Sequence, residues 1–534
     1  MSRGREEPGG PARGATASRM GRRRLWTLER TTVLACALGA ATVAGFAPLY
    51  LFPAPVFTLA AMLHLWTRAP DAKRAARLGW WFGLGYFVTG VSWVYVSLHD
   101  FGAMPAPLAA LATLLFCAYL ALFPAAVAYA YRASRGPLWV KALVLAPALW
   151  TLAEWIRGWL MTGFPWLGVG YSQVPLSPLA GYAPVLGVYG VTLATVMSAG
   201  AVFIAFERVM RPADIRKRRL SGSLAPLLPL VLLWLGGFGL MQVRWTDPVG
   251  EPVSVSLLQG NIPQNIKWTD EGLRATFVTY RDLALASSAR LIVMPETALP
   301  LFLHDVPPDY LAGLATHAQR NSGDVLIGVP EREAGGDYYN SVISIGAAPM
   351  QAYRKSHLVP FGEFIPLRPV LGWIVGVLAI PLQDFTAGTR RPRPLEIAGQ
   401  QVAVNVCYED AFGEEIIRQL PVATLLVNVS NVAWFGHSIA PQQHLQISQA
   451  RALETGRYML RATNTGMTAV IDERGRLVAA APQFATYALT ASVQGYTGAT
   501  PYVRCGNAVV LVLCGMLVAA AMGWAARATG AEST

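Results

Sequence analysis

The stretch Gln401-Val-Ala-Val-Asn-Val-Cys-Tyr-Glu-Asp-Ala-Phe-Gly-Glu-Glu415 places a cysteine where an apolar run ends and a polar one begins. The β-branched residues before Cys407 are typical of a buried strand, and a helix is expected to begin near Ala411. A cysteine at such a junction lies near unpaired N–H groups and the positive end of the helix, which both favour the thiolate. The pattern predicts an α/β fold that displays a reactive cysteine.

The chain around this stretch repeats the same alternation of short strands and helices. The expected strands are Val253–Gln259, Leu291–Met294, Val325–Val329, Val402–Val406, Leu425–Val429 and Thr468–Ile471. Helix-length segments lie at 270–288, 306–321, 411–420 and 441–457. Buried strands that alternate with helices indicate an α/β domain, which we place at 243–503.

The composition of the whole chain is that of a membrane protein. Of 534 residues, 54% are hydrophobic and 14% are charged, whereas about 25% of residues in soluble domains are charged. The mean hydropathy of +0.39 excludes a disordered chain and an ordinary cytosolic enzyme. The net charge of +12 alone would suit a nucleic-acid binder. Because the basic clusters flank apolar segments, we expect a bilayer and no nucleic acid as the partner.

Eight apolar segments are long enough to cross about 30 Å of hydrocarbon. They lie at 31–49, 51–66, 76–98, 105–131, 138–157, 185–206, 222–241 and 506–526. The first seven form an expected membrane domain at 31–242. The eighth belongs to a C-terminal part, 504–534, that ends in a short cytoplasmic tail.

The lysine and arginine residues set the expected orientation. Segments 1–30, 67–77, 132–141 and 207–220 carry eight, four, three and six of them, 21 in all, and the short connections on the other side hold at most Arg157. Basic loops stay in the cytoplasm. Both termini are therefore expected there, with 1–30 as a disordered basic tail and the α/β domain on the extracytoplasmic side.

Two further strand ends supply chemical partners for Cys407. Glu296 follows the run Leu291–Met294, where burial would raise its pKa toward that of a useful base. Lys355 follows another short strand and could stabilise an oxyanion. Each residue also has an ordinary interpretation. Cys407 could be a buried structural thiol, Glu296 could cap a turn, and Lys355 could be a surface charge.

Three segments taken together identify a catalytic site far more specifically than any one of these residues does alone. Pro295-Glu-Thr297, Lys355-Ser-His-Leu-Val-Pro-Phe-Gly-Glu363 and Cys407-Tyr-Glu409 resemble the Glu-Lys-Cys triad of the nitrilase superfamily. With the helical N-terminal half, residues 30–526 resemble the apolipoprotein N-acyltransferase family. Other matching blocks are Gly163–Leu167, Gly170–Gln173, Gln259–Trp268, Ala433–Gly436, Gln443–Gln446 and Arg451–Glu454. The sequence departs from the family pattern at Val432, His437 and Thr465, which all lie outside the triad.

The resemblance implies an αββα nitrilase-like sandwich on the outer face of a multi-pass domain in the bacterial inner membrane. It implies Glu296 as general base, Lys355 as transition-state stabiliser and Cys407 as nucleophile. The residues that would support the triad or shape and gate the site are Glu363, Tyr408, Glu409 and Trp268.

The implied reaction moves the sn-1 acyl chain of a membrane phospholipid, through a thioester on Cys407, to the α-amino group of the diacylglyceryl-cysteine of an apolipoprotein. Neither a cofactor nor a metal is expected, because no phosphate-cradling glycine motif and no metal-ligand spacing occurs. The apolar stretch Trp373–Leu382 would form part of a lid that shields the thioester from water.

Three alternatives remain open at this point. A membrane-anchored amidase or nitrile hydrolase would use the same triad with water as acceptor, although eight helices exceed what an anchor needs. A transporter with an extracytoplasmic binding domain would carry ionisable residues in its helices, for which Glu154 and Arg157 are the few candidates. A Cys-His protease would have to use His357 or His437.

Overall fold

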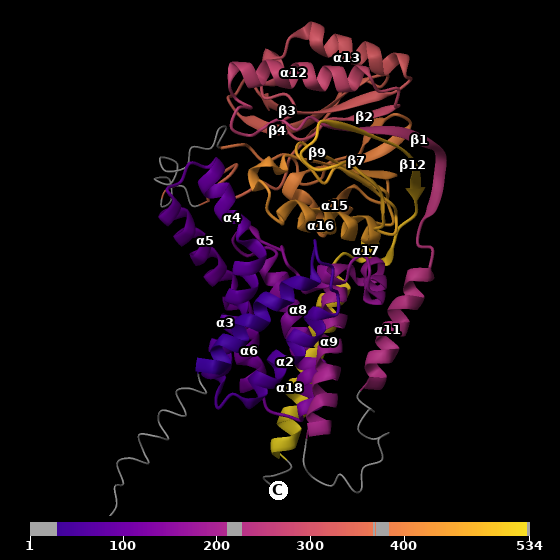
Figure 1. Ribbon diagram of the computed structural model, residues 1–534. Coiled ribbons are helices and arrows are strands. Elements are labelled where there is room, and N and C mark those ends of the chain that lie inside the picture. Colours follow the sequence, from indigo (N-terminus) through magenta and orange to yellow (C-terminus); the bar gives the residue numbers. More distant parts are fainter. Residues whose placement is uncertain (1–28, 211–226, 367–368, 370–383, 531–534) are drawn as a thin grey trace, which may run out of the picture.

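A computed structural model describes residues 29–210, 227–366, 369 and 384–530. Its lower part in Figure 1 is a bundle of helices, and its upper part is an α/β domain. Residues 1–28 of the tail expected at 1–30, and the expected lid at Trp373–Leu382, lie outside the described residues.

Helices lie in each of the eight ranges that the sequence predicts. The first covers 29–42. The others are α2 (Ala54–Arg68), α3 (Ala72–Val91) with α4 (Trp93–Val96), α5 (Ala106–Leu120) with α6 (Leu122–Ala133), α7 (Leu138–Val140) with α8 (Ala146–Arg157), α9 (Ala183–Met210), α11 (Leu227–Gln242) and α18 (Ala508–Gly530).

Three of these helical stretches are long and apolar enough to cross a membrane: Ala106–Ala133, Leu138–Arg157 and Pro178–Met210. The pair Ala72–Val91 and Trp93–Phe101, bent by 49°, would make a fourth span. Leu227–Gln242 and Ala508–Trp524 are apolar but shorter. Eight crossings and their orientation therefore stay a prediction.

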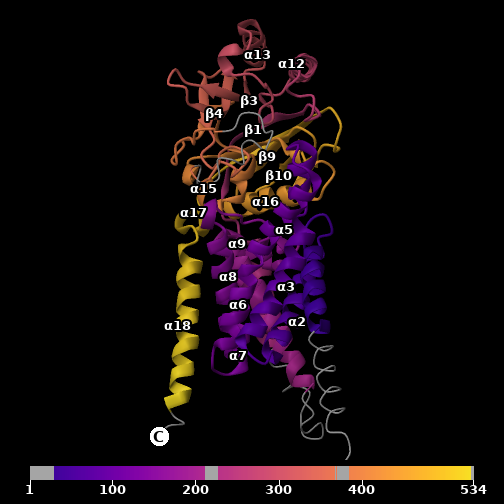
Figure 2. The ribbon, with the colours of Figure 1, turned by 90° about the vertical axis from the view of Figure 1, so that its left-hand side faces the viewer.

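Glycines let the helices of the bundle approach closely. A Cβ on Gly85 of α3 would lie 2.1 Å from the carbonyl oxygen of Cys36, and one on Gly200 of α9 would lie 2.2 Å from that of Ala142. Association through small residues is typical of helices packed in lipid, where the hydrophobic effect between helices is absent. Figure 2 shows α18 alongside this bundle, with the C-terminal end far from the α/β domain.

The α/β domain contains two six-stranded sheets. The first has the order β12-β1-β2-β3-β4-β5, and the second has the order β11-β10-β9-β8-β7-β6. Their bounds are β1 Asp247–Gln259, β2 Leu291–Val293, β3 Asp324–Arg332, β4 Tyr338–Gly346, β5 Gln351–Arg354, β6 Leu395–Ile397, β7 Gln400–Val406, β8 Leu425–Ser430, β9 Met459–Thr463, β10 Ala469–Ile471, β11 Leu477–Ala480 and β12 Tyr487–Thr497. The central strands β1–β2–β3 and β7–β8–β9 pair in parallel.

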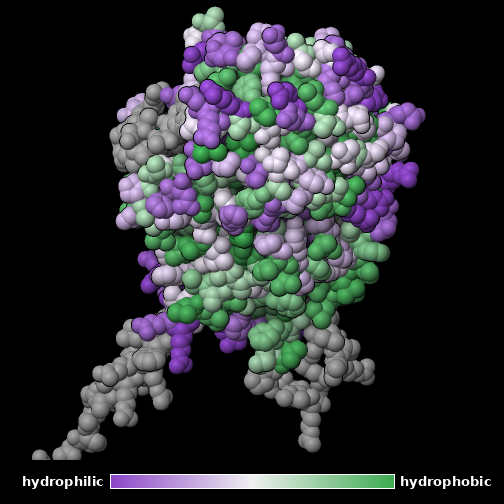
Figure 3. All heavy atoms as spheres, turned by 45° about the horizontal axis from the view of Figure 1, so that its top comes forward, coloured by the Kyte–Doolittle hydropathy of each residue, from purple (hydrophilic) through white to green (hydrophobic). Residues whose placement is uncertain are grey.

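The two sheets pack face to face with helices outside them. Val255 and Leu291 of the first sheet share a buried core with Val404 and Val427 of the second. Helices α12 (Asp270–Leu285) and α13 (Pro308–Arg320) cover the first sheet, and α15 (Gly413–Ile416) and α16 (Ala440–Thr455) lie between the second sheet and the helical bundle (Figure 1). The domain is therefore the αββα sandwich that the resemblance implies. Hydrophilic side chains gather at its outer end, and hydrophobic ones lie toward the bundle (Figure 3).

The helix expected over 411–420 is shorter than predicted, with α15 and a following 3₁₀ turn at Ile417–Gln419 covering only its middle. A 3₁₀ turn covers Cys407–Ala411, and the four residues of α15 begin only at Gly413. Phe412 separates them with φ −107° and ψ 83°, which are not helical values. Cys407 thus lies inside a tight turn, without a long helix behind it.

Polar side chains of α16 attach the sandwich to the helical bundle. Gln443 Oε1 accepts hydrogen bonds from the indole nitrogens of Trp93 (3.2 Å) and Trp166 (2.7 Å). Glu454 Oε1 accepts one from the backbone N–H of Val188 (2.6 Å). Both side chains are buried. The contacts fix the domain rigidly over the bundle, since breaking them would leave buried polar groups unpaired.

Candidate functional site

Three strand ends meet at one side of the sandwich. Glu296 follows β2, Lys355 follows β5, and Cys407 follows β7. Strands β2 and β5 run in the same direction, because β3 is parallel to β2 and two antiparallel pairings then lead to β5. Their carboxyl ends therefore lie at the same edge of the first sheet, where the turn after β7 of the second sheet faces them.

Lys355 is the centre of a buried charge cluster. Its Nζ lies 3.5 Å from Glu296 Oε1 and 2.9 Å from Glu363 Oε2. Asn340 Nδ2 donates to Oε1 of both carboxylates at 2.8 Å. Lys355 is 1% exposed, so its interpretation as a surface charge is wrong. The structure brings Glu363 to the position that the resemblance implies.

Glu296 is held as a carboxylate. Burial raises its pKa, but the charge of Lys355 and hydrogen bonds from Asn340, the backbone N–H of Asn431 (2.8 Å) and the thiol of Cys407 outweigh burial and bring the pKa below its usual value. The expectation of a raised pKa is therefore wrong. Glu296 is ionised at neutral pH and is already in contact with the proton that a general base would remove.

Cys407 rests as a thiol. Burial and the nearby carboxylate of Glu296 raise its pKa well above the ordinary value, while Lys355 opposes this shift. The expectation of a stabilised thiolate is wrong, because burial and the carboxylate of Glu296 together outweigh the charge of Lys355. Nucleophilic attack from this state requires transfer of the thiol proton to a base, and Glu296 is the predicted candidate.

The backbone at Cys407 is strained and firmly held. Its φ of +52° lies in the left-handed region, which is costly for a residue with a Cβ. The Cys407 carbonyl accepts hydrogen bonds from Asn428 Nδ2 (3.1 Å) and His444 Nε2 (3.2 Å). His444 in turn contacts Asp410 Oδ1 at 2.6 Å. Sequence reasoning assigned no role to these three residues, which lie on separate elements.

Glu409 joins the turn of Cys407 to the segment of Lys355. Its Oε1 accepts hydrogen bonds from the backbone N–H groups of Ser356 (2.7 Å) and His357 (3.0 Å). Its Oε2 accepts from the backbone N–H of Val406 (2.7 Å). Glu409 therefore holds the segments of Lys355 and Cys407 at a fixed separation.

Tyr408 links the turn to the loop that follows α8. Its hydroxyl donates to the carbonyl of Gly163 (3.0 Å), and its ring stacks with those of Phe164 and Trp166. Arg157 Nη1 donates to the carbonyl oxygens of Phe164 (2.6 Å) and Trp166 (2.5 Å). Arg157 therefore holds an aromatic wall beside Cys407.

In the loop before α12, two hydrophobic side chains are exposed and the charged one between them is buried. Ile266 and Trp268 are each 39% exposed, whereas Lys267 between them is 2% exposed. Trp268 makes no hydrogen bond or ring contact with the described residues of the site. Burial lowers the pKa of Lys267 to about 8, and Glu296 opposes this shift. Lys267 was missed as a site residue, and its place in the matching block Gln259–Trp268 was the only signal.

His357 and His437 do not serve Cys407. The ring nitrogens of His357 lie 3.2 Å from Glu415 Oε2 and 3.1 Å from the carbonyl oxygen of Thr162, and His437 packs on the ring of Phe484. Within the described residues, no cluster of three or more His, Cys, Asp or Glu side chains could hold a metal ion.

Two family models match the chain. The apolipoprotein N-acyltransferase N-terminal domain matches residues 38–201, and carbon-nitrogen hydrolase matches residues 254–502. Together they cover most of the helical bundle, without α11 and α18, and the sandwich that contains the three predicted catalytic residues.

Curated relatives are similar over nearly the whole chain. The apolipoprotein N-acyltransferase of Nitrosomonas europaea is 57% identical over 91% of this chain and 96% of its own length. That of Chromobacterium violaceum is 46% identical over 93% of this chain and 94% of its own. Among solved structures, an amidase from Nesterenkonia sp. is 16% identical with a TM-score of 0.36, over 50% of this chain and 96% of the amidase.

The electrostatics of the site predict how Glu296→Gln changes the thiol. The Glu296 carboxylate raises the pKa of Cys407. The amide removes that negative charge, so the thiol pKa falls and alkylation of Cys407 by iodoacetamide accelerates at a lower pH than in the parent protein. Peptide mass spectrometry as a function of pH separates Cys407 from the other cysteines. Glu473→Gln, on the far side of the second sheet, is the control, and an unchanged or raised alkylation midpoint in Glu296→Gln would contradict the geometry.

Proposed function

The chain belongs to the apolipoprotein N-acyltransferase family, and on that basis we propose that it transfers the sn-1 acyl chain of a membrane phospholipid to the α-amino group of the diacylglyceryl-cysteine of an apolipoprotein. It is a membrane-embedded bacterial acyltransferase with a carbon-nitrogen hydrolase domain. The observation that carries the proposed mechanism is the meeting of Glu296, Lys355 and Cys407, with the ammonium of Lys355 3.5 Å from Glu296 Oε1 and both charges close enough to shift the pKa of the Cys407 thiol.

In the first step, Glu296 takes the proton of Cys407 as Sγ attacks the sn-1 ester carbonyl. The ammonium of Lys355 stabilises the resulting oxyanion, and Glu363 keeps it in place from the other side. The carbon–oxygen bond then breaks, Glu296 returns its proton to the leaving oxygen, and a lysophospholipid departs. The acyl chain remains as a thioester on Cys407.

In the second step, the α-amino group of the lipoprotein attacks the thioester. Glu296 accepts a proton from the attacking nitrogen and passes it to the sulfur as the carbon–sulfur bond breaks. An amide is formed, and Cys407 returns to its thiol state. One carboxylate thus serves both halves of a ping-pong reaction, which suits a group that is ionised at rest.

The remaining predicted residues position the trio. Glu409 and Glu363 fix the distances among the three groups, and Tyr408 with the wall of Phe164 and Trp166 shapes the apolar side of the site. We also propose Trp268, which is 39% exposed in the loop before α12, as a gating residue.

The proposed membrane placement follows from both substrates having acyl chains. We place 31–242 and the helix after 504 in the bilayer, with 243–503 on the extracytoplasmic side and both termini in the cytoplasm. The arrangement of lysine and arginine residues supports this orientation. The side of the sandwich that bears Tyr408 faces the bundle, so an acyl chain can approach Cys407 from the bilayer.

The proposal predicts a coupled product pair. Detergent-purified protein given phosphatidylethanolamine and a synthetic diacylglyceryl-cysteine peptide should form N-acylated peptide and lysophospholipid in equal amounts, measured by liquid chromatography and mass spectrometry. Cys407→Ser should abolish transfer, and Lys355→Met should slow it about a hundredfold or more, because an oxyanion stabiliser is lost. Cys505→Ser, which removes an exposed thiol, is the matched control. Free fatty acid without acylated peptide would indicate a hydrolase, and transfer by Cys407→Ser would exclude the mechanism.

Lys267 gives a second prediction. Lys267→Met removes a buried positive charge that interacts with Glu296. The carboxylate then loses stabilisation, its pKa rises, and the acid limb of the rate–pH profile of transfer moves to higher pH. Lys73→Met removes an exposed lysine and should leave the profile in place. Coincident acid limbs in Lys267→Met and the parent would show that Lys267 does not act on the base.

A further inference from the structure

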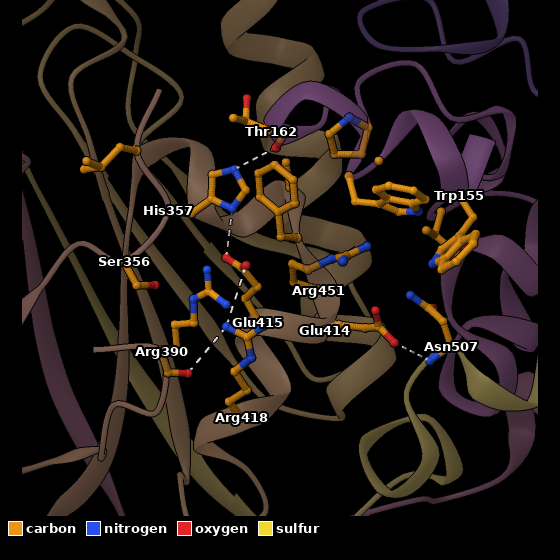
Figure 4. Close-up of a pocket in the computed structure, with 18 of the residues that line it drawn as sticks. Trp155, Thr162, Ser356, His357, Arg390, Glu414, Glu415, Arg418, Arg451 and Asn507 are labelled. Carbon is orange, nitrogen blue, oxygen red and sulfur yellow. Dashed lines mark hydrogen bonds and ion pairs between the residues drawn. The ribbon is translucent and has the colours of Figure 1, made fainter. Parts of the chain in front are cut away.

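A second site lies between the sandwich and the helical bundle. A cavity of about 620 Å³ opens there, and none of Glu296, Lys355 and Cys407 lines it. Its walls come from the end of α8, the start of α9, the segment after Lys355 and the turn around α15 (Figure 4). We call it the interdomain cavity. Its volume is within the range of about 300–1,000 Å³ that is usual for small-molecule sites.

The interior of the interdomain cavity holds a buried cation. Arg451 is 1% exposed and lies in the middle of the view in Figure 4, between His357 on one side and Trp155 on the other. Its Nη2 donates to Glu454 Oε1 and to the hydroxyl of Tyr171, both at 3.1 Å, while Nε has no hydrogen-bond partner. Burial raises the pKa of Glu454 to about 7, so its negative charge only partly balances Arg451 at neutral pH.

Gly413 packs directly against this cation. A Cβ at position 413 would lie 2.0 Å from Arg451 Nη1 and 2.5 Å from the hydroxyl of Tyr502. No side chain larger than hydrogen fits there. The absence of a side chain lets the backbone of α15 lie against the guanidinium and the phenol hydroxyl, and both of these residues line the cavity.

The mouth of the interdomain cavity carries both signs of charge. Arg390 and Arg418 are exposed, and among the described residues Arg390 forms no ion pair. Arg418 lies 3.6 Å from Glu415 Oε1. Glu414 is also exposed and accepts only a backbone hydrogen bond, from Asn507 (3.0 Å). A ligand that bears a phosphate and an ammonium group would find partners for both.

The remaining wall is aromatic and lies at the end of a membrane helix. Trp155 and Trp159 pack edge to face at 5.6 Å near the end of α8, and Trp159 is 52% exposed. Tryptophans at helix ends are typical of the level of lipid headgroups. This wall favours an amphiphile over a soluble metabolite.

From these observations we propose that the interdomain cavity binds the zwitterionic headgroup of a glycerophospholipid, with the phosphate at Arg390, Arg418 and Arg451 and the ammonium at Glu414 and Glu415. The inference relies on the membrane placement proposed above but not on the acyl-transfer chemistry. The same headgroup occurs on an intact phospholipid of the bilayer and on a lysophospholipid released at Cys407. The cavity is lined by Ser356, His357 and Phe412 but by neither Lys355 nor Cys407, so we place this headgroup apart from the reacting ester.

Native mass spectrometry of the full chain tests the proposal. The protein carries Cys407→Ser so that bound lipid is not consumed, and the result is then independent of acyl transfer. It is titrated with phosphatidylethanolamine, lysophosphatidylethanolamine and phosphatidylglycerol. We expect Arg390→Glu with Arg418→Glu to weaken one phosphatidylethanolamine site about tenfold or more, the size of a lost charge-assisted contact. The matched control is Arg281→Glu with Arg320→Glu, the same change of charge on α12 and α13.

The lipid arms identify the source and the chemistry of the ligand. Weaker binding of phosphatidylglycerol supports recognition of the ammonium by Glu414 and Glu415. If lysophosphatidylethanolamine displaces the bound lipid at a lower concentration than phosphatidylethanolamine does, the site is assigned to the lysophospholipid product. If phosphatidylethanolamine displaces it at the lower concentration, the site is assigned to bilayer lipid. Equal phosphatidylethanolamine binding in the charge-reversal and control proteins would overturn the proposal. The proposal would also be overturned if the Arg390→Glu, Arg418→Glu protein lost affinity only for a diacylglyceryl-cysteine peptide, because the cavity would then hold polypeptide.

Discussion

The buried ammonium of Lys355 is the constraint on which the site depends. Two carboxylates, Glu296 and Glu363, lie within 3.5 Å of it, and its charge is the largest of the influences that lower the pKa of Glu296 against the effect of burial. Lys355 thereby keeps Glu296 in the form that can take a proton. That carboxylate in turn raises the pKa of Cys407 and keeps the nucleophile protonated until a substrate arrives. On the extracytoplasmic side proposed for this domain, a resting thiol would protect Cys407, because the thiolate is the form that oxidants attack.

This charge cluster works only if the supporting elements hold their places. Glu409 brackets the segments of Lys355 and Cys407, and His444 with Asn428 holds the strained carbonyl of the nucleophile. The next residue, Tyr408, bonds to the loop that Arg157 organises. Arg157, a candidate for a transport pathway by its position in the sequence, instead builds the aromatic wall of the site. The helical bundle therefore contributes to the geometry of the site as well as to its location.

The strands that the sequence could predict are those whose residues form a clear aliphatic run. Strands β2, β7 and β8 are largely buried on both faces and appear as short aliphatic runs that are interrupted only by Asn405 and Asn428. Strand β9 was missed because Arg461 interrupts its apolar run, although that guanidinium is buried and bonded to Asn428. Strand β12 was missed because its exposed and buried residues are interspersed. The three catalytic candidates were found through their motifs, whereas the state of Glu296 depends on Asn340 and Asn431, which are distant in sequence. Lys267 was missed because a lysine in a loop is expected to be exposed, whereas this one is buried.

The central claim is that Cys407 carries the acyl chain between donor and acceptor, and the most direct measurement is the intact mass of the protein after incubation with phospholipid alone. The account predicts an increase by the mass of one acyl chain, removed by neutral hydroxylamine, located on Cys407 and absent from Cys407→Ser. Release of lysophospholipid should accompany it in equal amount. An unmodified mass in protein that still acylates a lipopeptide would contradict the account, because transfer would then proceed without a thioester.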